Sequence, residues 1–178
     1  MPLTKIQSLG ITDGTIVAGD IASGAITAAK LASGVGGKVL QVITATDSTS
    51  RSTSSTSFVT GSNTLSVSIT PAASANKVFV ICTCEASVAV NGATFLTIFR
   101  DSTNLGNTNG MVAMGGLSSP SSYDGTQCSI SVLDSPSTTS AITYQLYFRS
   151  DNASRTASIN GRSGTVVKGS ITAFEIKG

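Results

Sequence analysis

The hydrophobic residues at the start of the chain recur every five positions, a spacing typical of neither a helix nor a strand. They are Ile6, Ile11, Ile16, Ile21, Ile26 and Leu31. Helices repeat every 3.6 residues and strands every two, so this spacing predicts short extended pieces separated by turns, with glycines as turn residues. One copy of such a repeat cannot bury its aliphatic side chains. We therefore expect three chains to wind together with these residues as the core of a trimeric stem. The alternative is a disordered, low-complexity tail.

From about residue 38 onward, apolar and polar residues alternate in short runs, which predicts β-strands. The runs are 39–45, 65–69, 77–90, 94–100, 126–133, 142–148, 155–159 and 165–177. Asn-Gly, Asp-Gly and Ser-Pro pairs between them are typical turn residues. About eight to ten short strands at this spacing predict an all-β, antiparallel sandwich of the jelly-roll type. We expect a repeat arm over 1–37 and a jelly-roll head over 38–178.

Several of the expected strands are apolar on both faces. Phe79 and Ile81 alternate with valines, Phe95 and Phe99 alternate with other apolar residues, and Phe174 lies in the last strand. An antiparallel sandwich normally leaves one face of each sheet in water. A second apolar face indicates a second contact, which a subunit interface around a symmetry axis would provide. A closed barrel, or loops that cover the sheet, would provide it as well.

The composition agrees with β-structure and excludes several kinds of active site. Of 178 residues, 29 are Ser and 24 are Thr, only 11% are charged, and none is His or Trp. Without His, a Ser-His-Asp triad and His-ligated metal or haem sites are impossible. A net charge of +2 without a basic cluster argues against nucleic-acid binding. No apolar run is long enough to span a membrane, and residues 1–8 lack the apolar core of a secretory signal.

The remaining candidate chemistry is weak. Most of the nine carboxylates lie beside turn residues, where capping explains them without glycosidase activity. The three cysteines, Cys82, Cys84 and Cys128, are expected to be buried free thiols rather than a disulfide or metal site. The polar loop 101–110 lacks the acidic closing residue of the familiar calcium loop. We expect no enzyme activity, cofactor or metal.

Binding is expected in loops, because the loops farthest from the arm can vary without cost to the core. The longest polar, Gly-rich stretches of the head are 101–110 and 118–125. An exposed Tyr is a plausible contact for a glycan or a protein partner. The candidate surface contacts are Asn104, Asn107, Asn109, Tyr123 and Asp124.

Several segments resemble fibre proteins of tailed bacteriophages, especially marine and cyanobacterial phages. In the arm, 11–16 and 24–32 are similar to the shaft repeats of that group, and 36–42 is similar to its link from shaft to head. The similar segments of the head are 56–59, 65–71, 99–102, 133–136 and 144–150. The resemblance implies a homotrimeric virion protein with a slender stem and a head like those of the tumour-necrosis-factor superfamily.

The resemblance leaves two non-catalytic functions open. In the first, the protein is a short tail fibre whose stem docks on other phage virion proteins and whose head binds the host surface, with glycan as the expected partner. In the second, it is a capsid decoration or cement protein that stabilises the phage shell. Either implies assembly in the host cytoplasm and a place on the virion surface, in the tail or on the capsid.

Overall fold

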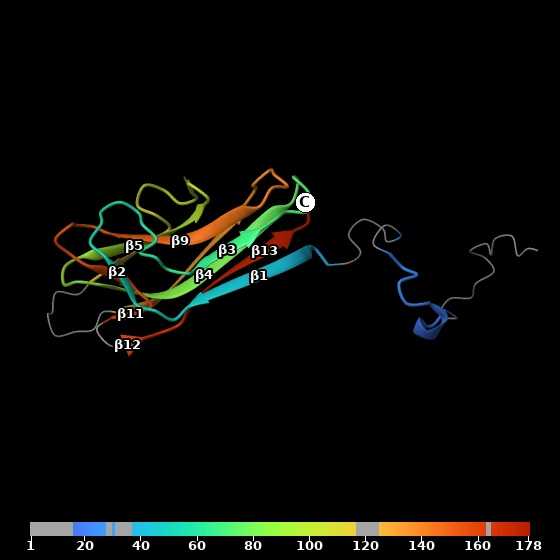
Figure 1. The fold of residues 1–178 in the computed structure, drawn as a ribbon, viewed down its shortest axis with the longest axis horizontal. Coiled ribbons are helices and arrows are strands. Elements are labelled where there is room, and N and C mark those ends of the chain that lie inside the picture. Colours follow the sequence, from blue (N-terminus) through green and yellow to red (C-terminus); the bar gives the residue numbers. More distant parts are fainter. Residues whose placement is uncertain (1–15, 28–29, 31–36, 117–124, 163–164) are drawn as a thin grey trace, which may run out of the picture. The chain divides into compact units, whose positions relative to one another are not determined.

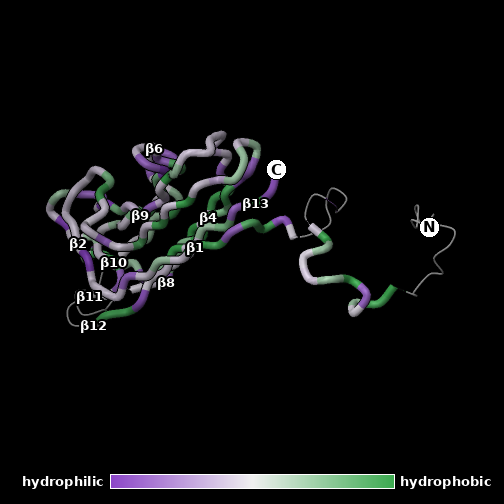
Figure 2. The backbone as a smooth tube through the Cα atoms, turned by 45° about the vertical axis from the view of Figure 1, so that its right-hand side comes forward, coloured by the Kyte–Doolittle hydropathy of each residue, from purple (hydrophilic) through white to green (hydrophobic). Residues whose placement is uncertain are grey.

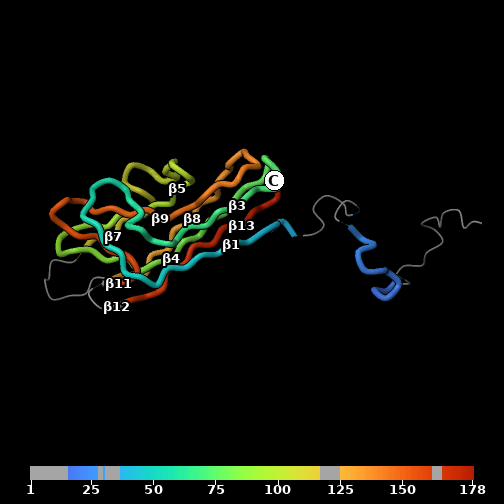
Figure 3. The backbone as a smooth tube through the Cα atoms, viewed as in Figure 1, coloured from blue at the N-terminus to red at the C-terminus, as the bar shows by residue number. Residues whose placement is uncertain are grey.

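The computed structural model describes residues 16–27, 30, 37–116, 125–162 and 165–178. Contacts divide the chain into two units, Met1–Lys38, here the arm, and Val39–Gly178, here the head (Figures 1 and 3). The strands of the described residues all belong to the head. No helix in the described part of the chain is both long and apolar enough to cross a membrane.

Sheet A forms one layer of the head. Its long strands are β1 (Val39–Asp47), β13 (Gly169–Ile176), β4 (Lys77–Val88) and β8 (Gly125–Asp134), paired antiparallel in that order. β8 lies along one edge of β4. On the other edge, β13 is followed by the short β10 (Ala157–Ile159), which also pairs with β2 (Arg51–Thr53).

Sheet B forms the second layer. Its strands are β3 (Ser66–Ile69), β9 (Ile142–Ser150), β5 (Ala93–Arg100) and β7 (Val112–Gly115), again antiparallel and in that order. The short β6 (Thr103–Asn104) pairs with the end of β5. A separate ribbon of β11 (Gly161–Arg162) and β12 (Thr165–Val166) interrupts the connection from β10 to β13.

The order of these strands makes the sandwich a jelly roll. Sheet A runs β1–β13–β4–β8 and sheet B runs β3–β9–β5–β7, so every connection between long strands except β5–β7 passes from one sheet to the other. This is the arrangement of two Greek keys in a double-sheet jelly roll. The predicted all-β jelly-roll sandwich is therefore confirmed (Figure 1).

The core follows from the alternation of the strands. In β9, alternate residues from Ile142 to Ser150 are buried, and those between them are half-exposed. β4 contributes Val78, Val80 and Cys82 from the facing sheet, all at most 1% exposed. Hydrophobic positions accordingly run along β4 (Figure 2). Side chains with a period of two thus build a single core between the layers.

The three cysteines are free and buried, as expected. Cys84 of β4 lies opposite Cys128 of β8 in the ladder, and both belong to the core cluster. Burial raises the pKa of the Cys82 thiol to about 12. The thiol is therefore protonated at neutral pH and serves as a small apolar side chain.

A polar network joins the two sheets at the end where the chain enters the head. The guanidinium of Arg100 in β5 donates to both carboxylate oxygens of Asp134 in β8, at 2.9 and 2.8 Å. The hydroxyl of Tyr144 in β9 donates to the same carboxylate at 2.6 Å. Burial and the bond to Asp134 raise the pKa of Tyr144, so the phenol stays protonated and keeps donating. One carboxylate of sheet A thus holds two strands of sheet B.

A second buried carboxylate, Glu175 of β13, fastens the same end. Its oxygens accept hydrogen bonds from the Asn76 amide at 2.6 Å, the Gln41 amide at 2.7 Å and the Ala72 N–H at 2.7 Å. Burial alone would raise the pKa of Glu175, but these three donors outweigh it and hold the pKa below the usual 4.5. The charged carboxylate therefore ties β1 and the loop before β4 to the last strand.

The described part of the arm consists of turns that repeat with the five-residue spacing. In each of three turns, a backbone N–H donates to the carbonyl three residues earlier: Asp20 to Val17, Ala25 to Ala22, and Lys30 to Thr27. In the first turn, the Ile21 N–H also donates to the Ala18 carbonyl. The first turn contains the 3-10 helix η2 (Ala18–Asp20). Gly24 has a φ of +77°, which L residues rarely adopt, so its position in the second turn favours glycine. Turns thus follow Ile16, Ile21 and Ile26 at the predicted spacing.

Candidate assembly and contact surfaces

The described isoleucines of the arm are exposed in the single chain. Ile16, Ile21 and Ile26 are 55%, 42% and 54% exposed, and each precedes one of the turns. The other predicted stem residues, Ile6, Ile11 and Leu31, lie outside the described residues. Aliphatic side chains at a fixed spacing in water favour contact with another apolar surface.

The outer face of sheet A carries an apolar patch, defined here as Leu40, Val42, Phe79, Leu133, Phe174 and Ile176. The strand register places Val42, Phe174, Phe79 and Leu133 in one row across β1, β13, β4 and β8. The outer residues of this row, Val42 and Leu133, are 53% and 54% exposed. The rings of Phe79 and Phe174 lie between them, with centroids 6.2 Å apart. Leu40 is also exposed, and Phe79, Phe174 and Ile176 are partly exposed, so the described residues leave the patch partly in water.

The same face becomes polar farther along the strands. The hydroxyls of Thr44 and Thr172 are hydrogen-bonded at 3.0 Å, and those of Thr83 and Ser170 at 2.9 Å. The patch itself contains no charged residue. The apolar patch therefore covers only part of the outer face of sheet A. A patch of limited extent is typical of a contact surface rather than of a fully buried layer.

The outer face of sheet B also carries hydrophobic residues, but side chains of the same chain cover them. Phe99 of β5 stacks on Tyr147 of β9 with centroids 4.0 Å apart, and Phe58 meets Phe99 edge-on at 6.2 Å. The guanidinium carbon of Arg149 lies 4.0 Å from the ring centroid of Phe95 and 5.3 Å from that of Phe58. These five residues, here the Arg149 cluster, form a second small packed group. The sequence showed the aromatic alternation of β5, but not the arginine that joins it.

The hairpin from β6 to β7 supplies the predicted asparagines. The side-chain carbonyl of Asn104 accepts hydrogen bonds from the Thr97 hydroxyl at 2.6 Å and the Gly106 N–H at 2.9 Å. This side chain therefore stabilises the hairpin. Asn107 accepts from the Asn109 N–H at 2.7 Å. Asn109 accepts from the Arg149 guanidinium at 3.1 Å and so joins the hairpin to the Arg149 cluster.

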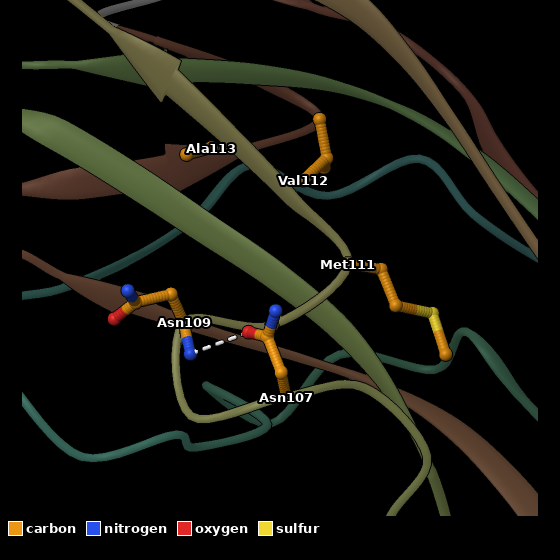
Figure 4. Close-up of a pocket in the computed structure, with 6 residues that line it drawn as sticks. Asn107, Asn109, Met111, Val112 and Ala113 are labelled. Atoms are coloured by element: carbon orange, nitrogen blue, oxygen red, sulfur yellow. Dashed lines mark hydrogen bonds between the residues drawn. The ribbon is translucent and has the colours of Figure 1, made fainter.

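A shallow hollow adjoins these asparagines. Its volume is about 200 Å³, and its lining residues are Asn107, Asn109, Gly110, Met111, Val112 and Ala113. Figure 4 shows the side chains of Asn107 and Asn109 beside one another on the hairpin, with Met111 and Val112 on the strand that leaves it. The hollow thus combines amide groups with apolar side chains.

The two candidate loops, 101–110 and 118–125, are connected to opposite ends of the head. Asp101 exchanges hydrogen bonds with Thr143, next to the Ile142–Ile69 pair, and Gln41 donates to the Thr70 carbonyl. The loop therefore begins at the end where the chain enters the head. β8 starts at Gly125, opposite Ser87, at the other end of the head. Tyr123 and Asp124 lie outside the described residues.

The buried and paired carboxylates serve the fold. Asp47 accepts bonds from the Thr64 N–H at 2.9 Å and the Thr49 N–H at 2.8 Å. Burial acts to raise the pKa of Asp47, but these bonds and nearby Arg51 hold it below the usual value. Burial raises the pKa of Glu85. Within the described ranges, no three His, Cys, Asp or Glu side chains are grouped so that they could hold a metal ion.

Comparisons with known proteins show a distant likeness in fold. No family model matches the chain, and no curated protein matches it significantly. Among solved structures, it is similar to the VP2 subviral particle of infectious bursal disease virus, at 13% identity and a TM-score of 0.36. The match covers 78% of this chain but only 37% of the VP2 chain. At this TM-score, the likeness carries no inference about function.

Proposed function

We propose that the protein is a non-catalytic structural component of a tailed-bacteriophage virion, a short homotrimeric fibre. In this proposal, the arm binds other virion proteins and the head binds the host surface. The observation that carries the proposal is the arm, where Ile16, Ile21 and Ile26 are exposed at five-residue intervals between turns. A chain that exposes aliphatic residues in strict phase is suited to assembly with copies of itself.

The apolar patch on sheet A supports assembly from a second position in the sequence. Val42 and Leu133 are each about half-exposed in a row of apolar residues, and exposed Lys77 lies at the edge of the patch beside Ile176. Covering each would contribute about 1 kcal/mol by area, roughly half of what full burial contributes. The six patch residues carry no charge of their own, and the Lys77 ammonium at the edge of the patch can stay in water, so copies of the same chain can pack against the patch. We propose that these patches face the threefold axis of the trimer.

Light scattering on the purified protein tests the assembly. The expected mass is three times the 17.9 kDa chain. A stable monomer at micromolar concentration would contradict the proposed architecture.

The place on the virion is tested by copy number and by adsorption. A tail fibre should be present in the stoichiometry of tails, and excess purified protein should compete with phage for host cells. If copies match the capsid shell, and virions that lack the protein adsorb normally but break on heating, the protein is a decoration or cement protein.

A further inference from the structure

Arg149 differs from the other arginines whose side chains are described. Those three each pair with an aspartate, as Arg51 with Asp47, Arg100 with Asp134 and Arg155 with Asp151. Among the described residues, no carboxylate lies within 4.0 Å of the Arg149 guanidinium. Its recorded acceptors are neutral, the Asn109 side chain and the Ser150 carbonyl, both at 3.1 Å. A half-buried positive charge without a counter-charge favours binding of an anion.

The Arg149 guanidinium is also held in place. It lies 4.0 Å from the Phe95 ring centroid and 5.3 Å from that of Phe58, within the range of cation–π contacts. The bond to Asn109 fixes the group from the side of the hairpin. A guanidinium has five N–H donors, and two of its nitrogens are engaged by the acceptors named above. The remaining N–H donors can bind an anion, and the guanidinium loses little conformational entropy on binding because it is already held in place.

The neighbouring hollow fits the rest of a sugar. Its lining joins the amides of Asn107 and Asn109 to the apolar side chains of Met111 and Val112 (Figure 4). Amide groups exchange hydrogen bonds with hydroxyls, and the C–H face of a sugar ring packs on apolar side chains. Asn109 belongs both to the hollow and to the arginine contact, so an anionic group at Arg149 and a ring in the hollow could be bound together.

We propose that Arg149 and the hollow beside it form a binding site for anionic sugars, saccharides that carry a carboxylate or a phosphate. In this site, Arg149 would donate hydrogen bonds to the anionic group. Asn107 and Asn109 would contact hydroxyls of the sugar ring, and Met111 would pack against its C–H face. The proposal rests on host attachment for its biological ligand and names the chemistry of that contact. Three such sites in a trimer would add avidity to individually weak binding.

The test is a calorimetric titration of the full chain with three sugars. These are a galacturonate trisaccharide, glucose 6-phosphate and, as a neutral control, maltotriose. We expect the wild type to bind at least one acidic sugar about tenfold more tightly than maltotriose. The two acidic probes distinguish a carboxylated from a phosphorylated ligand. Equal binding of acidic and neutral sugars, or no binding of the acidic ones, overturns the proposal.

Two variants locate the site, and a third is the control. Arg149→Gln should lower the affinity for the acidic sugar about tenfold, whereas Arg155→Gln, which removes the same charge from a paired arginine, should change it less than twofold. Asn109→Asp places a carboxylate against Arg149 and should abolish binding while leaving the melting temperature at least as high as in the wild type. Wild-type affinity in either site variant overturns the proposal.

Adsorption assays separate this site from the attachment function itself. If excess wild-type protein and excess Arg149→Gln protein block phage adsorption equally, attachment stands and the site is overturned. If the wild type does not block adsorption, attachment as proposed fails, and the titration alone then decides whether the site binds anionic sugars.

Discussion

The outer faces of the two sheets cover one core, yet they differ in what covers their own hydrophobic residues. On sheet B, Phe95 and Phe99 are covered by Arg149 and Tyr147 from the next strand and by Phe58 from a connection. On sheet A, the described residues leave Val42 and Leu133 about half in water. An outward apolar residue is therefore no sign of a subunit interface by itself. Of these two faces, the outer face of sheet A is the one whose apolar side chains the same chain leaves uncovered.

The largest expected effect follows from placing a charge in the apolar patch. Leu133→Asp should convert the proposed trimer to monomers without unfolding the head, because Leu133 is 54% exposed and lies outside the core cluster. Burying an unpaired carboxylate in three equivalent interfaces would cost several kcal/mol. Light scattering gives the mass, and far-ultraviolet circular dichroism reports the fold.

Ser131→Asp is the matched control for Leu133→Asp. Ser131 is exposed on the same face of β8, two residues from Leu133, in the next row of the sheet. That row joins it to Ile81, Thr172 and Thr44, so Ile81 is its only apolar member. Ser131→Asp should leave the trimer intact. If both variants dissociate equally, or neither does, the contrast between the two halves of this face is wrong.

The next effect tests the tie that holds both sheets together. Asp134→Ala leaves the Arg100 guanidinium and the Tyr144 hydroxyl without their shared acceptor, and should lower the free energy of unfolding by about 3–5 kcal/mol. Tyr144→Phe removes one hydrogen bond and should cost about 1–2 kcal/mol. Urea unfolding at a fixed chain concentration measures both. Asp151→Ala, which breaks the more exposed pair with Arg155, should cost less than about 1 kcal/mol.

A smaller effect distinguishes two buried carboxylates of sheet A, Glu175 and Glu85, by how their contributions to stability change with pH. The folded-state pKa of Glu175 is lowered, so its stabilising contribution is present above the usual value of 4.5 and is lost as the pH falls through the folded pKa. Glu175→Gln should lower the free energy of unfolding by about 1–3 kcal/mol at pH 7. The difference from the wild type should shrink in acid, as urea titrations at pH 7 and pH 3 would measure.

The contribution of Glu85 to stability should depend on pH in the opposite direction. Burial raises its folded-state pKa, so any stability linked to its protonation is present below the unfolded pKa and is lost as the pH rises through the folded pKa. Glu85→Gln should therefore be neutral or stabilising at pH 7. Equal loss of stability in Glu85→Gln and Glu175→Gln would contradict the assignment of these roles.

Most of the fold could be predicted because alternation is a local signal. The runs 39–45, 77–90 and 126–133 correspond to β1, β4 and β8. The short β2 was missed, since Arg51–Thr53 has no apolar residue to alternate with polar ones. Its pairing partner is β10, a hundred residues away in the sequence, so only the tertiary structure could define it as a strand.

The candidate site could be predicted only in part, because its contacts join distant segments. Asn109 stood out as a polar residue in a Gly-rich loop, but Arg149 lies forty residues later within a strand. The hairpin can close over sheet B because Gly110 has no side chain. A Cβ there would lie 2.5 Å from the Leu96 carbonyl oxygen and 3.0 Å from the Phe58 ring. Sequence cannot show such a close approach before the fold is known.

The smallest effect on the head should come from the arm. Replacing Ile16, Ile21 and Ile26 together by Ser should leave the melting temperature of the head unchanged, because their removal touches no residue of the core cluster. In a trimeric stem, each buried isoleucine contributes roughly 1.5–3 kcal/mol, so the triple variant should open the arm to protease and to amide exchange. Val17 tests the phase of the repeat, since it is 58% exposed, close to the 55% of Ile16, but begins a turn. Ile16→Ser should increase exchange in the arm, and Val17→Ser should not. Equal effects would show that position within the five-residue period does not matter, and unfolding of the head would show that the arm and the head are one cooperative unit.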